Sequence, residues 1–220
     1  MRLIVFDLDG TLIDSRQDLA DATNQMIQEL GGTPLPVDAV ALMVGEGAPL
    51  LVRRALEMAS LHVDPLEALG RFLNIYESRL LVHTRPYAGT MEMLAALAGR
   101  YHLAVLTNKP SAATREILNG LGLAPWFSDV IGGDTPFRRK PDPAGLYHLV
   151  SQAQATPATT MFVGDSAIDL ETARRARTNV CLARYGFGYR FNLDDFDGTE
   201  HFIDEPQALI PLIGWLSAAE

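Results

Sequence analysis

Two aspartates, Asp7 and Asp9, follow directly on a short apolar run at residues 3–6. Four consecutive apolar residues are typical of a strand that is buried on both faces. Carboxylates at the end of such a strand cost free energy unless a partner or a reaction uses them, and Gly10 allows the chain to turn sharply there. The pattern suits a nucleophile at Asp7, an acid/base at Asp9 and a hard cation between them. An ordinary Asp-Gly turn is the alternative.

Three more polar clusters follow strand-like runs or precede helix-like segments. Two carboxylates four residues apart at the start of a helix face the same way, so Asp165 and Asp169 are expected to act together. A hydroxyl and an amide that follow a strand can bind an anionic oxygen, and a lysine supplies a compact positive charge. These clusters are Thr107 with Asn108, Lys140 before Pro141, and Asp165 with Asp169.

Apolar runs and helical patterns alternate through most of the chain. The alternation predicts a parallel sheet with helices on both faces, which is a doubly wound α/β fold. Ligands of such sheets bind beyond the carboxyl ends of the strands, where every polar cluster above is expected. The predicted strands are 3–6, 103–106, 130–131, 161–163 and 180–183, and the predicted helices between them are 90–98, 111–121, 142–154 and 167–177.

Residues 16–82 break this alternation, because they contain helical patterns and no convincing strand. They predict an all-helical cap, residues 16–83, inserted after the first strand and placed over the carboxyl edge of the sheet. The catalytic core is then formed by 1–15 and 84–220, with hinges near residues 14–15 and 84–86. The predicted cap helices are 18–30, 37–44, 48–60 and 65–82.

The composition excludes several classes of function. The 220 residues are 48% hydrophobic and carry a net charge of −9 without a basic stretch, so nucleic-acid binding is not expected. No apolar stretch approaches the roughly 20 residues of a membrane span. The lone Cys181 cannot form a disulfide within one chain. The first strand begins directly after the N-terminus, without a signal-peptide pattern, which predicts a cytoplasmic protein. A monomer or a homodimer is compatible with these features.

Four segments occur in a familiar order and spacing: DLDGTLIDS, TNKP, RRKPDP and GDSAID. Over nearly the whole chain, this set resembles the haloacid dehalogenase superfamily of phosphatases. The resemblance implies a Rossmann-like core with an inserted helical cap. It also implies that Asp7 attacks phosphorus to form an aspartyl phosphate, while Asp9 protonates the leaving oxygen and then activates water.

The same resemblance assigns the remaining members of the site. Mg²⁺ would be held by the carboxylates of Asp7 and Asp165 and by the backbone carbonyl of Asp9, with Asp169 orienting its neighbours. The phosphoryl oxygens would be bound by Thr107, Asn108, Lys140 and backbone N–H groups. Lys109, beside this set, is expected either at the phosphate or in a solvated loop.

Two other branches of the superfamily fit less well. Dehalogenases lack the second aspartate of the first motif, which is present here as Asp9. Phosphonoacetaldehyde hydrolases use a lysine of the lid, and residues 16–82 contain no lysine. Residues 195–199 repeat the DxDGT pattern without a preceding strand, so they are expected to form a surface turn.

The cap segment VGEGAPLLVRRAL, with PYAGT, WFSDVIGGDT and RRKPDPAGL, looks most like bacterial phosphoglycolate phosphatases. Gly45 and Gly47 before a helix could present backbone N–H groups to an anion. Arg53 or Arg54 could pair with a substrate carboxylate, or both could be exposed at a helix joint. Sugar phosphates, N-acetylmuramate 6-phosphate and pyrophosphate are alternative substrates. A phosphomutase is an alternative class, and a non-enzymatic binding protein is disfavoured by the two retained aspartates.

Overall fold

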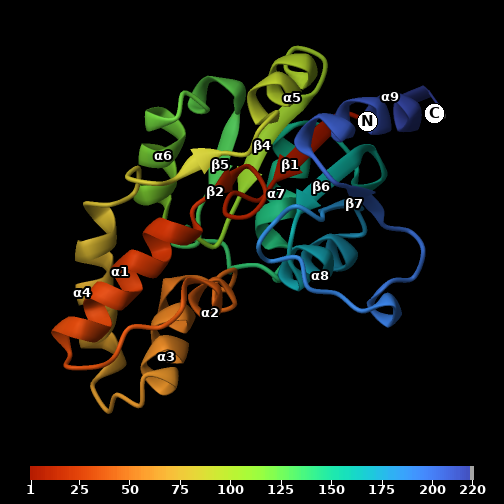
Figure 1. Ribbon diagram of the computed structural model, residues 1–220. Helices are drawn as coiled ribbons and strands as arrows, with labels where there is room; N and C mark the ends of the chain where they lie inside the picture. The colour runs from red at the N-terminus through yellow and green to blue at the C-terminus, as the bar shows by residue number, and fades with distance from the viewer. Residues whose placement is uncertain (219–220) are drawn as a thin grey trace.

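A six-stranded parallel sheet forms the centre of the computed structural model, which describes residues 1–218 (Figure 1). The strand order is β5-β4-β1-β6-β7-β8, and every neighbouring pair is parallel. The strands are β1 (Leu3–Phe6), β4 (His102–Leu106), β5 (Asp129–Ile131), β6 (Thr160–Gly164), β7 (Asn179–Ala183) and β8 (His201–Ile203).

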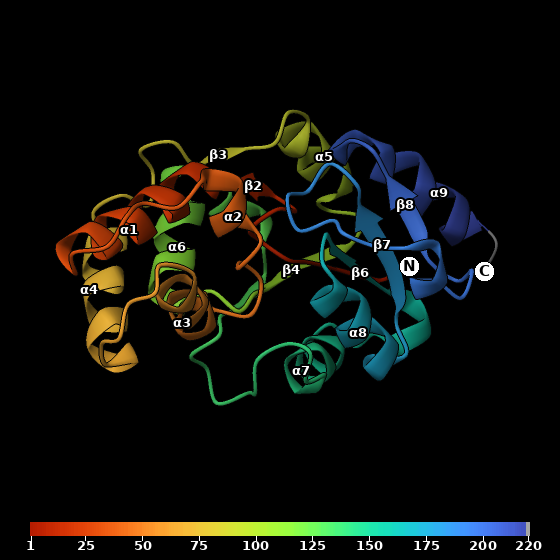
Figure 2. The ribbon, with the colours of Figure 1, turned by 60° about the horizontal axis from the view of Figure 1, so that its bottom comes forward.

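Helices cover both faces of this sheet, as Figure 2 shows from the side. Alternate residues of β1 enter two different hydrophobic clusters, because successive side chains of a strand point to opposite faces. Ile4 and Phe6 pack with α5 and α9, and Leu3 and Val5 pack with α7 and α8. The predicted doubly wound α/β fold is therefore confirmed. The helices of the sheet region are α5 (Thr90–Leu97), α6 (Ser111–Gly120), α7 (Ala144–Gln152), α8 (Ala167–Ala176) and α9 (Leu209–Ala218).

The order of the strands reverses at β1. The chain continues from β1 to β4 and β5 on one side, and β6, β7 and β8 extend the sheet on the other. The loops that leave β1 and its two neighbours therefore diverge, and they leave a crevice at the carboxyl end of β1. This crevice is where the sheet can hold a ligand.

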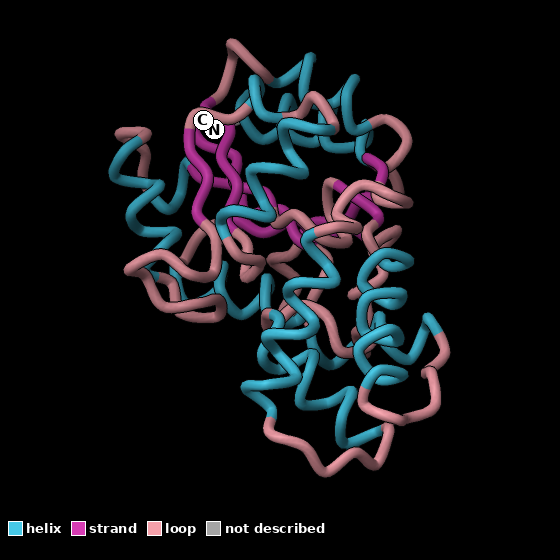
Figure 3. Tube along the Cα trace, turned by 90° about the vertical axis from the view of Figure 1, so that its left-hand side faces the viewer, coloured by secondary structure: helices cyan, strands magenta, loops and turns pink. Residues whose placement is uncertain are grey.

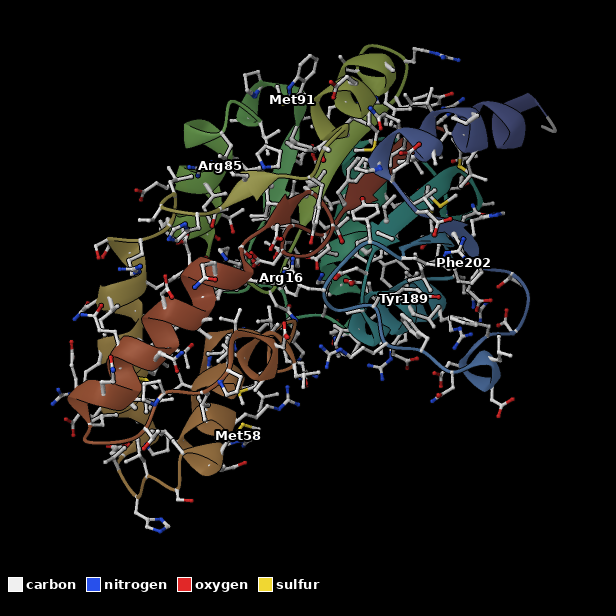
Figure 4. The ribbon with its side chains drawn as sticks, viewed as in Figure 1. Arg16, Met58, Arg85, Met91, Tyr189 and Phe202 are labelled. Carbon is white, nitrogen blue, oxygen red and sulfur yellow. The ribbon has the colours of Figure 1, made fainter. Side chains whose placement is uncertain are left out.

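The four remaining helices lie together beyond the carboxyl edge of the sheet, and Figure 3 shows this helical part below the strands. Helix α1 contacts α2 and α4, and α3 contacts α4. In Figure 4, Met58 of this part and Phe202 of β8 lie well apart, on the helical side and the sheet side of the molecule. The helices are α1 (Arg16–Glu29), α2 (Val37–Ala41), α3 (Ala48–Met58) and α4 (Pro65–Glu77).

A small antiparallel pair, β2 (Ile13–Asp14) and β3 (Arg85–Pro86), joins the helical part to the sheet. Arg16, which Figure 4 places at this junction, forms a bidentate pair with the two carboxylate oxygens of Asp14. The pair lies next to both predicted hinges. The division into a core of 1–15 and 84–220 and a cap of 16–83 stays a prediction.

Some predicted elements differ from the structure. The helix predicted over 65–82 ends at Glu77, and turns follow it. Strand β8 was not predicted, because three residues that include a histidine carry no periodic signal. Helix α6 begins at Ser111, as predicted, and the Ser111 hydroxyl donates to Asp134. No helix among residues 1–218 is long and apolar enough to cross a membrane.

Asp18 of α1 fixes the segment that returns from the helical part to the sheet. Its buried carboxylate accepts hydrogen bonds from the His83 and Thr84 N–H groups and from Thr84 Oγ1, at 2.8–3.0 Å. We expect Asp18→Ala to lower the free energy of unfolding by about 3 kcal/mol or more, because three donors lose their acceptor. Urea unfolding measures the change. The exposed Asp194→Ala should change stability by less than about 0.5 kcal/mol. Equal stability of the two variants would contradict this role.

Candidate active site

Three neighbouring strands bring three predicted site residues to one place. Asp7 follows β1, Thr107 follows β4 and Asp165 follows β6, and all three are buried. The Asp7 N–H donates to the carbonyl of Val163 at 2.9 Å, which holds the end of β1 against β6. Parallel strands in register place the residues after them side by side, so positions distant in the sequence meet at the switch point.

Lys140 binds two of the carboxylates. Its Nζ lies 2.8 Å from Asp7 Oδ1 and 2.7 Å from Asp169 Oδ1. Burial lowers the pKa of Lys140, but the attraction of Asp169 and Asp7 outweighs burial, so the pKa is raised and the ammonium stays charged. The other oxygen of Asp169 accepts from the N–H groups of Asp165 and Ser166 and from the Ser166 hydroxyl. Asp169 thus holds Lys140 against the start of α8.

Asp7, Asp165 and Asp169 form a buried acidic cluster in which one carboxylate oxygen of each residue lies within 4.8 Å of the other two. Burial raises the pKa of Asp7 to about 7, with Lys140 opposing the rise and Asp169 adding to it. Burial, Asp169 and Asp7 raise the pKa of Asp165 well above its ordinary value. A divalent cation would relieve this repulsion, and a set of oxygen donors is what a hard cation prefers.

The shape of the loops also fits a bound cation. Gly10 has a φ of +88°, and a Cβ there would lie 2.0 Å from Asp165 Oδ2, so only glycine allows this close approach. Asp165 accepts one hydrogen bond from the Thr11 hydroxyl at 3.2 Å and one from the Gly188 N–H at 2.7 Å. Asp169 is the most heavily engaged of the three carboxylates, with Lys140 on one oxygen and three donors on the other, so Asp7 and Asp165 are better suited to ligate.

Lys109 holds Asp9. Its Nζ lies 2.9 Å from both carboxylate oxygens of Asp9, and the Ser15 hydroxyl donates to one of them. The lysine side chain is only 4% exposed, so the solvated-loop alternative is wrong. Its ammonium lies 4.8 Å from the centre of the Tyr76 ring. Burial lowers the pKa of Lys109, but the attraction of Asp9 and then of Tyr76 outweighs burial. The pKa is therefore raised, and the ammonium stays charged.

Asn108 connects the helical part to Lys140. Its Nδ2 donates to the carbonyls of Gly45, at 2.9 Å, and Lys140, at 3.0 Å, while its Oδ1 accepts from the Lys140 N–H at 2.9 Å. Both amide hydrogens are therefore used within the protein. In this arrangement Asn108 positions Lys140 and the Gly45 loop, and it does not offer its amide to a phosphoryl oxygen.

A cavity of about 180 Å³ lies between this cluster and the helical part. Its core side is lined by Asp7, Asp9, Thr107, Asn108 and Lys109. Its other side presents Gly45, Gly47 and Ala48 with the apolar or aromatic side chains of Leu19, Leu51, Phe72, Tyr76 and Leu80. If a ligand places its reacting group at the aspartates, the rest of the ligand is therefore enclosed by α1, α3 and α4.

The two predicted arginines do not line this cavity. Arg53 lies 3.9 Å from Glu57 and its side chain is 60% exposed, and Arg54 pairs with Glu46. Helix α3 buries Leu51, Val52, Ala55 and Leu56, so the positions between them face outward. Of the two alternatives that the sequence left open, the structure therefore shows the exposed arginines.

The second DxDGT copy is a surface turn, as predicted. Asp195 and Asp197 are exposed, and Asp197 accepts hydrogen bonds from the N–H and hydroxyl of Thr199. The sequence did not predict Tyr76, Ser15 or Gly188 as neighbours of the site. Only the motif-like Gly186-Phe187-Gly188 was a possible signal, because a Cβ at Gly188 would lie 2.8 Å from Asp165 Oδ2.

The fold and the site define a hydrolase of a known type. Residues 4–183 match the model of the haloacid dehalogenase-like hydrolase family. The chain belongs to this family, which confirms the resemblance of its four motifs. The phosphatases of the family work with a divalent metal, in agreement with the acidic cluster of Asp7, Asp165 and Asp169.

The chain is similar over almost its full length to proteins named phosphoglycolate phosphatase. One from Pseudomonas putida is 39% identical over 217 residues, which cover 96% of this chain and 79% of the relative. One from Rhodospirillum rubrum is 39% identical over 222 residues, covering 94% and 92%. The crystal structure of a predicted phosphoglycolate phosphatase from Haemophilus somnus superposes with a TM-score of 0.90 at 30% identity, covering 96% and 97% of the two chains.

Proposed function

We propose that this protein is a Mg²⁺-dependent phosphatase that hydrolyses 2-phosphoglycolate to glycolate and phosphate. One observation carries the proposal: the buried carboxylate of Asp7 is held by Lys140 beside Asp9 on the floor of a small cavity. The relatives from Pseudomonas putida and Rhodospirillum rubrum, at 39% identity, support this choice of substrate.

The first step transfers the phosphoryl group to the protein. An oxygen of the Asp7 carboxylate attacks phosphorus, and the bond from phosphorus to the ester oxygen breaks. Asp9 donates a proton to the departing oxygen, which leaves as the alcohol. Lys109 and Ser15 hold the Asp9 carboxyl group in place for this transfer.

The second step frees the phosphate. A water molecule attacks phosphorus of the aspartyl phosphate, and Asp9 takes its proton. The bond from phosphorus to the Asp7 oxygen breaks, which restores the carboxylate. The helical part shields the reacting group from bulk water, because apolar side chains such as Leu51 and Phe72 enclose it.

The charge that develops on the phosphoryl oxygens needs positive partners. Asp7, Asp165 and the backbone carbonyl of Asp9 would hold Mg²⁺, which supplies charge neutralisation when bound. The Lys140 ammonium and the Thr107 hydroxyl would bind the phosphoryl oxygens. Asp169 acts through Lys140 by fixing its position.

A panel of phosphate esters tests the proposal. We expect kcat/KM, measured by phosphate release with Mg²⁺, to be higher for 2-phosphoglycolate than for the other compounds. These are small sugar phosphates, N-acetylmuramate 6-phosphate, pyrophosphate and p-nitrophenyl phosphate. An ester with a higher kcat/KM would overturn 2-phosphoglycolate as the substrate but would still agree with a phosphatase reaction. A phosphomutase would interconvert a sugar phosphate with little free phosphate, which would overturn the reaction itself.

A further inference from the structure

Tyr76 carries a buried hydroxyl that donates to no acceptor in the described part of the protein. The residue is 4% exposed, and its Oη has no hydrogen-bond partner. A buried, unpartnered hydroxyl costs about 1–3 kcal/mol, so such groups are rare without a reason. Among the four unpartnered buried polar side-chain atoms of the described chain, this one belongs to a residue that lines the active-site cavity.

The hydroxyl is a donor at any ordinary pH. Burial raises the pKa of Tyr76 to about 12, with nearby Lys109 opposing the rise. The ring is fixed by stacking on Phe72, at 5.6 Å between centroids, and by the Lys109 ammonium above it. These contacts hold the orientation of the side chain, and the Lys109 ammonium can only donate, so the hydroxyl proton stays available to an incoming acceptor.

Other groups of the same cavity suit an anion. Lys109 is the only lysine or arginine among the described residues that line it. The N-terminus of α3 also faces the cavity through Gly47 and Ala48, and it has no side-chain cap. Helix N-termini favour negative charge, because their first N–H groups lack partners. The remaining wall is mostly apolar apart from the exposed side chains of Glu77 and Glu116, so it limits the size of what can enter.

We infer that Tyr76, with Lys109 and the N-terminus of α3, forms the subsite that selects a small leaving group bearing a carboxylate. The inference deepens the proposed function and rests on it, because it names how the glycolate end of the substrate is recognised. Tyr76 is then the specificity-determining residue, and Arg53 and Arg54, which pair with glutamates outside the cavity, are not.

The test compares two esters that differ in one group. Ethyl phosphate is the analogue of 2-phosphoglycolate in which a methyl group replaces the carboxylate. We expect Tyr76→Phe to lower the ratio of kcat/KM for 2-phosphoglycolate to that for ethyl phosphate by about tenfold or more, because a hydrogen bond to a charged group is lost. Tyr147→Phe removes an exposed hydroxyl that donates to Arg175 outside the cavity, and it should keep the ratio. Arg54→Ala should keep it as well.

Stability separates recognition from a structural role. Because the Tyr76 hydroxyl proton has no acceptor in the described part of the folded protein, Tyr76→Phe should unfold at the same temperature as the wild type or higher. A ratio within twofold of the wild type in Tyr76→Phe would overturn the inference, and so would a tenfold drop in Arg54→Ala alone. A wild type that does not prefer 2-phosphoglycolate over ethyl phosphate would overturn the proposed substrate first, before any variant is compared.

Discussion

Asp7→Asn is expected to lower kcat by a factor of about 10³ or more while the chain still folds. An amide is nearly the same size as a carboxylate but is a far poorer nucleophile, so the phosphoryl group cannot be transferred to the protein. The fold should persist, because Lys140 keeps its second carboxylate partner, Asp169, at 2.7 Å. Phosphate release measures the loss, and circular dichroism checks the fold.

The second DxDGT copy supplies the matched control. Asp195→Asn and Asp197→Asn change the same residue type in the same local pattern, but on an exposed turn. Both variants should keep wild-type kcat. Near-normal turnover in Asp7→Asn would refute the assignment of Asp7 as the nucleophile. Loss of turnover in the control variants would instead place the reaction at the second DxDGT copy.

Removal of divalent metal is expected to stop hydrolysis. Three buried carboxylates lie together against one lysine, so without a cation the site should repel a phosphate ester. Exhaustive treatment with EDTA should abolish phosphate release, and Mg²⁺ should restore it. Ca²⁺ should restore it poorly, because its coordination is looser and larger.

Stability gives a second measure of the same site. Mg²⁺ that binds the folded chain should raise its unfolding temperature, because the ion offsets the repulsion between Asp7 and Asp165. Asp165→Asn should reduce both this shift and the activity. Undiminished activity after exhaustive chelation, together with no thermal shift on adding Mg²⁺, would show that the acidic cluster does not serve as a cation site.

The core of the site could be predicted from the sequence, because its signals are local. An apolar run that ends in Asp7, Thr107 or Asp165 predicts a buried strand with a polar end. The alternation with helices makes those strands parallel, and parallel strands present their carboxyl ends at one edge. Sequence order and secondary structure were therefore enough to bring these three residues together.

The surroundings of that core were decided by tertiary packing. The Lys109–Asp9 pair, the Asn108 link to Gly45 and the unpartnered Tyr76 hydroxyl all depend on how the helical part sits against the sheet. No periodicity in one segment predicts a contact with a segment 60 to 100 residues away.

The sequence by itself determined the fold class, the nucleophile and acid/base candidates and the family, because short motifs and hydrophobic patterns carry them. Only the tertiary structure decided which side chains of the helical part face the cavity. Arg53 and Arg54 turn outward because the apolar face of α3 must be buried, and Tyr76 faces the cavity from α4. Recognition of the leaving group depends on that packing, so it can be predicted only once the helices are placed.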